Sequence, residues 1–139
     1  MEKSPKIICI VIAVFILGAC ATAPTWKGMS ESEIAAWQGL GVDAKEAQTF
    51  VKAGLRPDDV ANWNAAGINS YDSILEWHSK EFSSNEAASW IEQQFDVDEA
   101  VRWKKENFQP EEAQRWKSQN FDLKEAIKNR EKGLQPIRE

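Results

Sequence analysis

The chain has 139 residues and a formal net charge of −5 at pH 7, with 17 basic side chains, 22 acidic side chains, two cysteines and one histidine. This length suits a single small domain, and the acidic balance is not that of a nucleic-acid-binding protein. Because His78 is the only histidine, no pair of histidines can bind zinc.

The first twenty residues carry a targeting pattern. Lys3 and Lys6 precede an unbroken apolar run at residues 7–19, which is too short to cross a bilayer as a helix and is typical of a signal peptide. The run ends in Leu-Gly-Ala-Cys at residues 17–20. This segment resembles the signal of bacterial lipoproteins, which implies cleavage before Cys20 and acylation of its thiol and amino terminus. Residues 1–19 would then be the cleaved lipoprotein signal peptide. The alternative is an ordinary secretory signal with a chance cysteine.

The resemblance also implies a location. Ala21, rather than an acidic residue, follows Cys20, and in enterobacterial lipoproteins this favours the outer over the inner membrane. Each buried methylene contributes about 0.8 kcal/mol, so several acyl chains would bind a membrane firmly. Cys9 would be lost with the signal peptide and Cys20 would carry lipid, which leaves no disulfide and no thiol nucleophile. We therefore expect a lipid-anchored protein of the bacterial cell envelope.

The charge of the mature chain is uneven. Without Glu2, Lys3 and Lys6 it keeps 15 basic and 21 acidic residues, yet residues 101–139 carry ten basic and seven acidic ones. This basic region could contact lipid headgroups or an acidic partner, although a solvated surface of mixed sign is the simpler interpretation. Residues 20–29 are the expected anchor and linker, in which Trp26 either covers the first helix or lies at the membrane interface.

A thirteen-residue pattern repeats from residue 29 onward. A first apolar column recurs once in every unit, and only the step from Ile68 to Phe82 is longer, by a single residue. A second column, mainly tryptophan, lies eight residues further along each unit, or nine in the longer unit. The first column is Met29, Val42, Leu55, Ile68, Phe82, Phe95, Phe108, Phe121 and Leu134, and the second is Trp37, Phe50, Trp63, Trp77, Trp90, Trp103, Trp116 and Asn129.

This period indicates separate short helices. Thirteen residues make about 3.6 helical turns, so one continuous helix would rotate its apolar face from unit to unit. Capping residues follow most members of the first column, with an acid three residues later, as in a capping box. In the fourth unit this predicts Asn69 as the cap and Asp72 as the acid. Two units without a good cap begin with Pro57 and Pro110, which suit the first helical position.

The far ends of the predicted helices carry glycine or asparagine, which tolerate a left-handed backbone. Glu81 and Gln94 stand at this position in two units and break the pattern, because residues of these types would be strained in a left-handed backbone. Helices of about nine residues are marginal alone, so their stability must come from stacking. We predict an all-α array of about eight short helices at residues 30–132, solenoid-like or a compact spiral, and a C-terminal tail at 133–139.

The tryptophan column has two interpretations. The rings either fill the core between stacked helices or form an exposed ladder that stacks on sugars. The acids that recur three residues after each capping position form an acidic column. This column could suggest paired-carboxylate catalysis, but capping explains it better and no other group converges with it. The six ladder residues are Trp37, Trp63, Trp77, Trp90, Trp103 and Trp116.

We therefore expect a non-catalytic structural, adaptor or assembly protein, bound to the membrane through lipid on Cys20, whose repeat array contacts another envelope protein. The alternative is a glycan-binding module, for peptidoglycan among others, that uses the tryptophan ladder. We expect no enzyme activity and no cofactor. The two functions make opposite demands on the tryptophans, because a core must be buried and a stacking ladder must be exposed.

Overall fold

The computed structural model describes residues 25–137, which form eight α-helices of nine residues each and no strand. The predicted all-α array of short helices is confirmed. Cys20 and the predicted signal peptide lie outside the described residues. The helices are α1 (Glu31–Gly39), α2 (Ala44–Lys52), α3 (Pro57–Ala65), α4 (Tyr71–Ser79), α5 (Ser84–Glu92), α6 (Val97–Lys105), α7 (Pro110–Ser118) and α8 (Leu123–Glu131).

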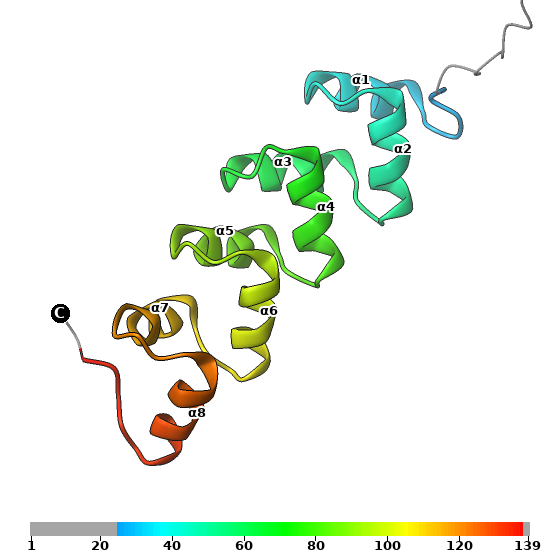
Figure 1. Ribbon diagram of the computed structural model, residues 1–139. Helices are drawn as coiled ribbons and strands as arrows, with labels where there is room; N and C mark the ends of the chain where they lie inside the picture. Colours follow the sequence, from blue (N-terminus) through cyan, green and yellow to red (C-terminus); the bar gives the residue numbers. More distant parts are fainter. Residues whose placement is uncertain (1–24, 138–139) are drawn as a thin grey trace, which may run out of the picture.

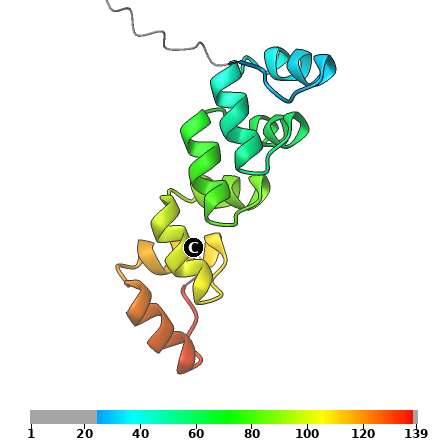
Figure 2. The same cartoon turned by 90° about the vertical axis from the view of Figure 1, so that its right-hand side faces the viewer.

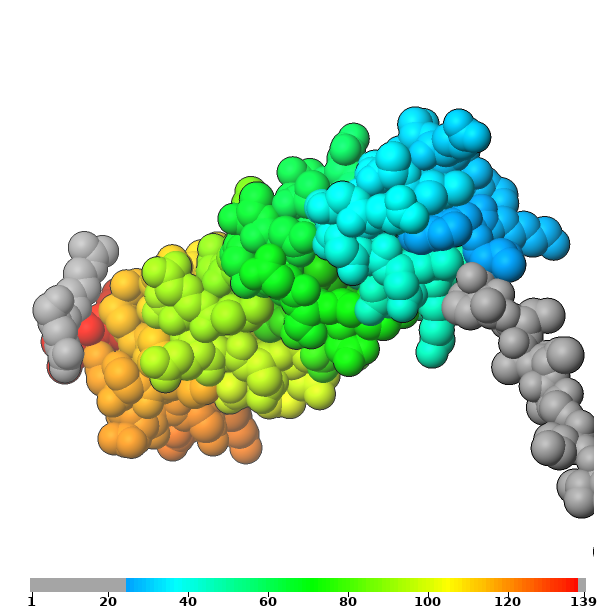
Figure 3. Space-filling view, turned by 90° about the horizontal axis from the view of Figure 1, so that it is seen from above, coloured from blue at the N-terminus to red at the C-terminus, as the bar shows by residue number. Residues whose placement is uncertain are grey.

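The helices stack in two columns (Figure 1). The odd-numbered helices form one column and the even-numbered helices the other, so two thirteen-residue units make one structural repeat. Helix α1 contacts α3, and α3 contacts α5. The side view in Figure 2 and the space-filling view in Figure 3 show the first and last helices at opposite ends of an elongated body. Of the two predicted arrangements, the described part of the chain adopts the solenoid.

Capping side chains begin many of the helices. At the start of α5 the Ser83 hydroxyl accepts the Glu86 N–H at 3.3 Å, and the Glu86 carboxylate accepts the Ser83 N–H at 3.0 Å. Helix α6 has only half of such a box, because Asp96 caps it while the Glu99 carboxylate binds Lys117 instead. Boxes confirmed by both hydrogen bonds are therefore fewer than the sequence pattern predicted. They are Ser30 with Glu33, Asp43 with Glu46, Ser83 with Glu86, and Asp122 with Glu125.

The predicted cap of the fourth unit is wrong. Helix α4 begins at Tyr71 with Ser70 as its N-cap, so Asn69 lies in the turn and Asp72 at the second helical position. The Ser70 side chain makes no capping hydrogen bond. The turn absorbs the extra residue of the longer unit because Ile74 and Trp77, which are 1% and 4% exposed, then keep the helical positions of their counterparts.

Every helix ends in the same hydrogen-bonded turn, a Schellman motif. After α6, the Phe108 N–H donates to the Trp103 carbonyl at 3.1 Å, and the Asn107 N–H donates to the Lys104 carbonyl at 2.9 Å. Glu81 and Gln94 take the left-handed position of this turn with φ of 62° and 63°. Such a backbone costs a residue with a Cβ roughly 1–2 kcal/mol, which the packing of the turn must offset.

The Schellman turn explains the two aromatic columns. It brings the residue three from the helix end against the second residue beyond the cap, and here these are the second-column and first-column residues. The Trp103 and Phe108 rings lie edge to face at 4.9 Å, and Phe95 approaches Trp103 from the preceding turn at 6.1 Å. Each first-column residue between Val42 and Phe121 therefore closes one helix and opens the next. All six ladder tryptophans are at most 4% exposed, as a core requires.

Short segments cover both ends of the array. At the first end, Trp26 packs against the core and the Gln48 amide donates to the Thr25 and Lys27 carbonyls. This favours the interpretation of Trp26 as a cover for the first helices. At the other end, Pro136 is buried and the Gln119 amide pairs with both backbone groups of Ile137. The folded body therefore extends beyond residues 30–132 on both sides.

Candidate partner-binding grooves

One kind of groove recurs along the array. Each is lined by the third, sixth and seventh residues of one helix, the last turn of the next helix, and the first residues of the helix after that. The α6/α8 groove, the α4/α6 groove and the α5/α7 groove have volumes of about 680, 490 and 380 Å³. Because the lining positions repeat, the aromatic residues recur in every groove while the charged positions vary.

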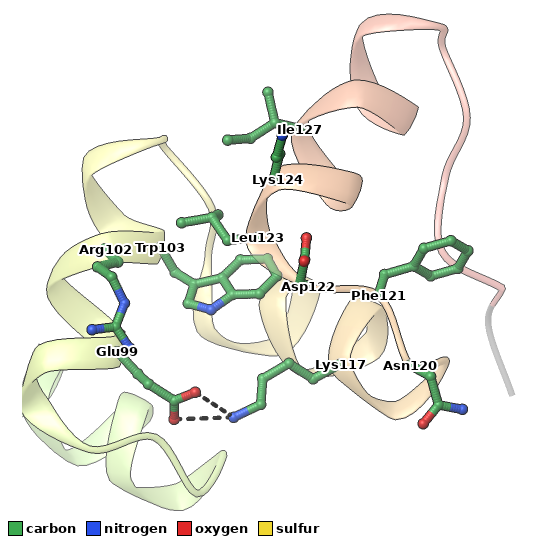
Figure 4. A pocket seen from close by; sticks show the side chains of 10 residues that line it. All are labelled: Glu99, Arg102, Trp103, Lys117, Asn120, Phe121, Asp122, Leu123, Lys124 and Ile127. Atoms are coloured by element: carbon green, nitrogen blue, oxygen red, sulfur yellow. Dashed lines mark hydrogen bonds and ion pairs between the residues drawn. The ribbon is translucent and has the colours of Figure 1, made fainter.

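The α6/α8 groove is the largest of the three (Figure 4). Trp103 of α6 points toward Leu123 of α8, and Ile127 lies one turn further along α8. The Phe121 ring points to the other side, toward the C-terminal tail. The groove thus has an apolar floor from α6 and α8, bounded by charged side chains.

The charged rim of the α6/α8 groove is mainly basic. Lys117 binds both carboxylate oxygens of Glu99 at 3.0 Å, and these two charges neutralise each other. Arg102 and Lys124 are exposed at the rim, and Asp122 is engaged as the N-cap of α8. Two cations therefore remain available to a ligand, beside an apolar floor.

The α4/α6 groove has the opposite charge. Its aromatic residues Trp77 and Phe95 correspond to Trp103 and Phe121, each two repeat units later. The charged positions differ: Glu76 corresponds to Arg102, Asp98 to Lys124, and Ile91 to Lys117. One groove is thus mainly acidic and carries an exposed isoleucine, its neighbour on the same column of helices is mainly basic, and Arg102 of α6 lines both.

The eighth residues of α4, α6 and α8 join the units across the stack. Lys104 of α6 lies 4.2 Å from the Phe82 ring centroid, and Arg130 of α8 lies 3.8 Å from that of Phe108. Arg130 also donates to the Glu106 carbonyl at 2.7 Å. Each cation therefore meets the carbonyl end of the helix two places earlier and an aromatic face, and both contacts are favourable.

The single histidine belongs to this structural set. His78 is the eighth residue of α4, and its Nε2 lies 3.0 Å from the Ala53 carbonyl at the end of α2. Its position therefore repeats the role of Lys104 and Arg130. Within residues 25–137 no cluster of His, Cys, Asp or Glu is suited to hold a metal ion.

Five members of the acidic column accept the backbone N–H of their N-cap residue: Glu33, Glu46, Asp59, Glu86 and Glu125. The Ser83 backbone N–H donates to Glu86 and holds the pKa of that carboxyl below its ordinary value, and the Ser83 hydroxyl and Lys104 lower it further. The Ser30 backbone N–H lowers the pKa of Glu33 in the same way. Both carboxylates are thus ionised at neutral pH and bound to their own helix, which does not suit a general acid.

The sequence-predicted site residues divide into two sets. The six ladder tryptophans lie in the core, linked through the first-column residues, and Cys20 lies outside the described residues. The groove residues Arg102, Lys124 and Ile127 were not singled out from the sequence. The signal that could have found them is the change of charge between positions two repeat units apart, read together with their shared helical position.

Comparisons with family models, with curated proteins and with solved structures find no match for this chain. None of the helices within residues 25–137 has the length and hydropathy needed to cross a membrane.

Proposed function

We propose that this protein is a lipid-anchored adaptor or assembly factor of the bacterial cell envelope, without catalytic activity, which binds another protein through its grooved surface. The lipoprotein-like segment ending at Cys20 supports the anchor and favours the outer membrane. The repeated grooves support the binding role, because stacked repeats form extended surfaces that read a partner at several places.

The single observation that carries this proposal is the α6/α8 groove. Its floor of Trp103, Leu123 and Ile127 can enclose a bulky apolar side chain, and Arg102 and Lys124 can pair with acidic groups beside it. An apolar centre with a charged rim is the usual anatomy of a protein–protein contact. A glycan-binding function has less support, because the tryptophans that would stack on sugars are at most 4% exposed.

Photocrosslinking in intact cells tests the binding role. A photoreactive amino acid replaces Lys124 at the groove rim in the full chain, and a matched variant carries it at Lys132, which is exposed just beyond the end of α8. We expect a discrete adduct with another envelope protein from position 124 and not from position 132. Equal patterns at both positions, or no adduct at 124, would contradict the proposal.

The anchor has its own test. Cys20→Ser should abolish labelling by a fatty-acid analogue and release the protein from membranes, because the variant lacks the thiol that accepts lipid. Persistent labelling of this variant would refute the lipid attachment. It would leave the groove proposal intact, since the groove lies in a different part of the chain.

A further inference from the structure

The even-numbered helices present two neighbouring grooves of opposite charge. Glu76 and Asp98 line the α4/α6 groove, Lys124 lines the α6/α8 groove, and Arg102 of α6 lines both. All four side chains are exposed. Because the two grooves are built from equivalent positions of successive repeats, they have the same framework and differ mainly in their charge.

Helix α6 carries both charges at the boundary between the two grooves. Asp98 and Arg102 are four residues apart and therefore lie on one side of α6. If a second copy placed its α6 antiparallel to this one, Asp98 of each copy would face Arg102 of the other. A two-fold axis generates such a reciprocal pair of contacts from a single surface.

We propose that this face binds a second copy of the chain, as an antiparallel pair related by a two-fold axis through α6. The acidic α4/α6 groove of each copy lies on the basic α6/α8 groove of the other. Ile91, which is 41% exposed at the rim of the α4/α6 groove, enters the apolar floor between Trp103 and Ile127 of the second copy.

Charge complementarity favours a second copy as the occupant of the two grooves together. An acidic segment of another protein, as in the proposed function, matches the α6/α8 groove alone and leaves the α4/α6 groove unfilled. A second copy satisfies both grooves at once. The contacts within one chain do not prevent this, because the Lys80–Asp98 ion pair is long, at 3.9 Å, and its side chains are 45% and 73% exposed. This inference goes beyond the proposed function and does not depend on it.

Native mass spectrometry of the full-length chain in detergent micelles tests the pairing. We expect a monomer–dimer equilibrium that shifts to dimer with rising protein concentration and toward monomer as ionic strength rises, because added salt screens exposed charges. A chain that stays monomeric at every concentration overturns the proposal.

Charge reversal locates the surface. One variant, Glu76→Lys with Asp98→Lys, makes both grooves basic, and a second variant, Arg102→Glu with Lys124→Glu, makes both acidic. For each variant alone, we expect the dissociation constant of the dimer to rise at least tenfold. Their mixture should form a heterodimer, since basic grooves then meet acidic ones at both contacts. Circular dichroism of each variant shows that the exposed substitutions leave the fold unchanged.

The mixing result decides between this face and any other. Restored dimer in the mixture, together with unchanged dimer in the control variant Glu111→Lys in the α5/α7 groove, supports the two-fold pairing. Dimers that persist in both separate variants, or a mixture that stays monomeric, would overturn it. A photocrosslink from position 124 to a second copy supports this pairing, and one to a different envelope protein supports the proposed function, so the failure of one proposal is distinguishable from that of the other.

Discussion

Replacing Trp103 by alanine should destabilise the array strongly. Trp103 is 3% exposed, and its ring contacts Phe95 at 6.1 Å and Phe108 at 4.9 Å. Truncation removes both contacts and leaves a cavity in the turn that joins α6 to α7. Large-to-small changes of this kind cost about 3–5 kcal/mol, a large share of the roughly 5–15 kcal/mol that stabilises a typical domain.

Thermal unfolding followed by far-ultraviolet circular dichroism measures this effect. For a domain of about this size, 1 kcal/mol lowers Tm by a few degrees, so we expect Trp103→Ala to lower Tm by more than about 10 °C. Val51→Ala is the matched control, because its side chain is 39% exposed and surface truncation changes stability by about 0.5 kcal/mol or less. A Trp103→Ala protein that keeps the wild-type Tm would refute the assignment of the tryptophan column to the core.

Three further changes test the joints between units. Arg130→Met should lower the free energy of unfolding by about 1–2 kcal/mol in urea titrations, because it removes the charge that binds the Glu106 carbonyl and lies over Phe108 while keeping much of the side-chain length; an unchanged midpoint would contradict the role of this contact. Gln94→Gly should raise stability by about 1 kcal/mol, since glycine adopts φ of 63° without strain, and a lower Tm would show that the Gln94 side chain matters more than its backbone. The pKa of Glu86 is lowered in the folded state, so its stabilising contribution is complete above the ordinary carboxyl pKa of 4.5 and is lost as pH falls through the lowered value; Glu86→Gln should therefore weaken the fall of Tm on acidification more than Glu92→Gln does.

Local signals predicted the helices well because each unit is nearly autonomous in its hydrogen bonding. Caps such as Ser83 and Asp122 satisfy the first amide groups of the helix in their own unit, so these hydrogen bonds do not depend on the neighbouring units. The prediction for the fourth unit failed because it placed the extra residue inside the helix, whereas the turn contains it and Ser70 instead of Asn69 is the N-cap. The packing of Ile74 and Trp77 selected Ser70, and that packing depends on neighbouring helices rather than on the cap.

The stacking and the grooves were beyond local signals. The contact of Arg130 with Phe108 joins residues far apart in the chain, and a thirteen-residue repeat does not say which helices become neighbours. Once alternate helices form separate columns, positions two repeat units apart become equivalent. Only then is it apparent that Glu76 and Arg102 place opposite charges at the same position of two neighbouring grooves. The sequence did not decide between a buried and an exposed tryptophan ladder, because both require the same spacing of tryptophans.

Quenching of tryptophan fluorescence by acrylamide, on the full-length chain in detergent, tests the division between a tryptophan core and a charged, grooved surface most directly. Six of the seven tryptophans are at most 4% exposed, and Trp26 is partly buried. We therefore predict blue-shifted emission that is poorly quenched until the helices unfold. A red-shifted and readily quenched emission from a chain that is still helical by circular dichroism would place the rings on the surface and contradict the account.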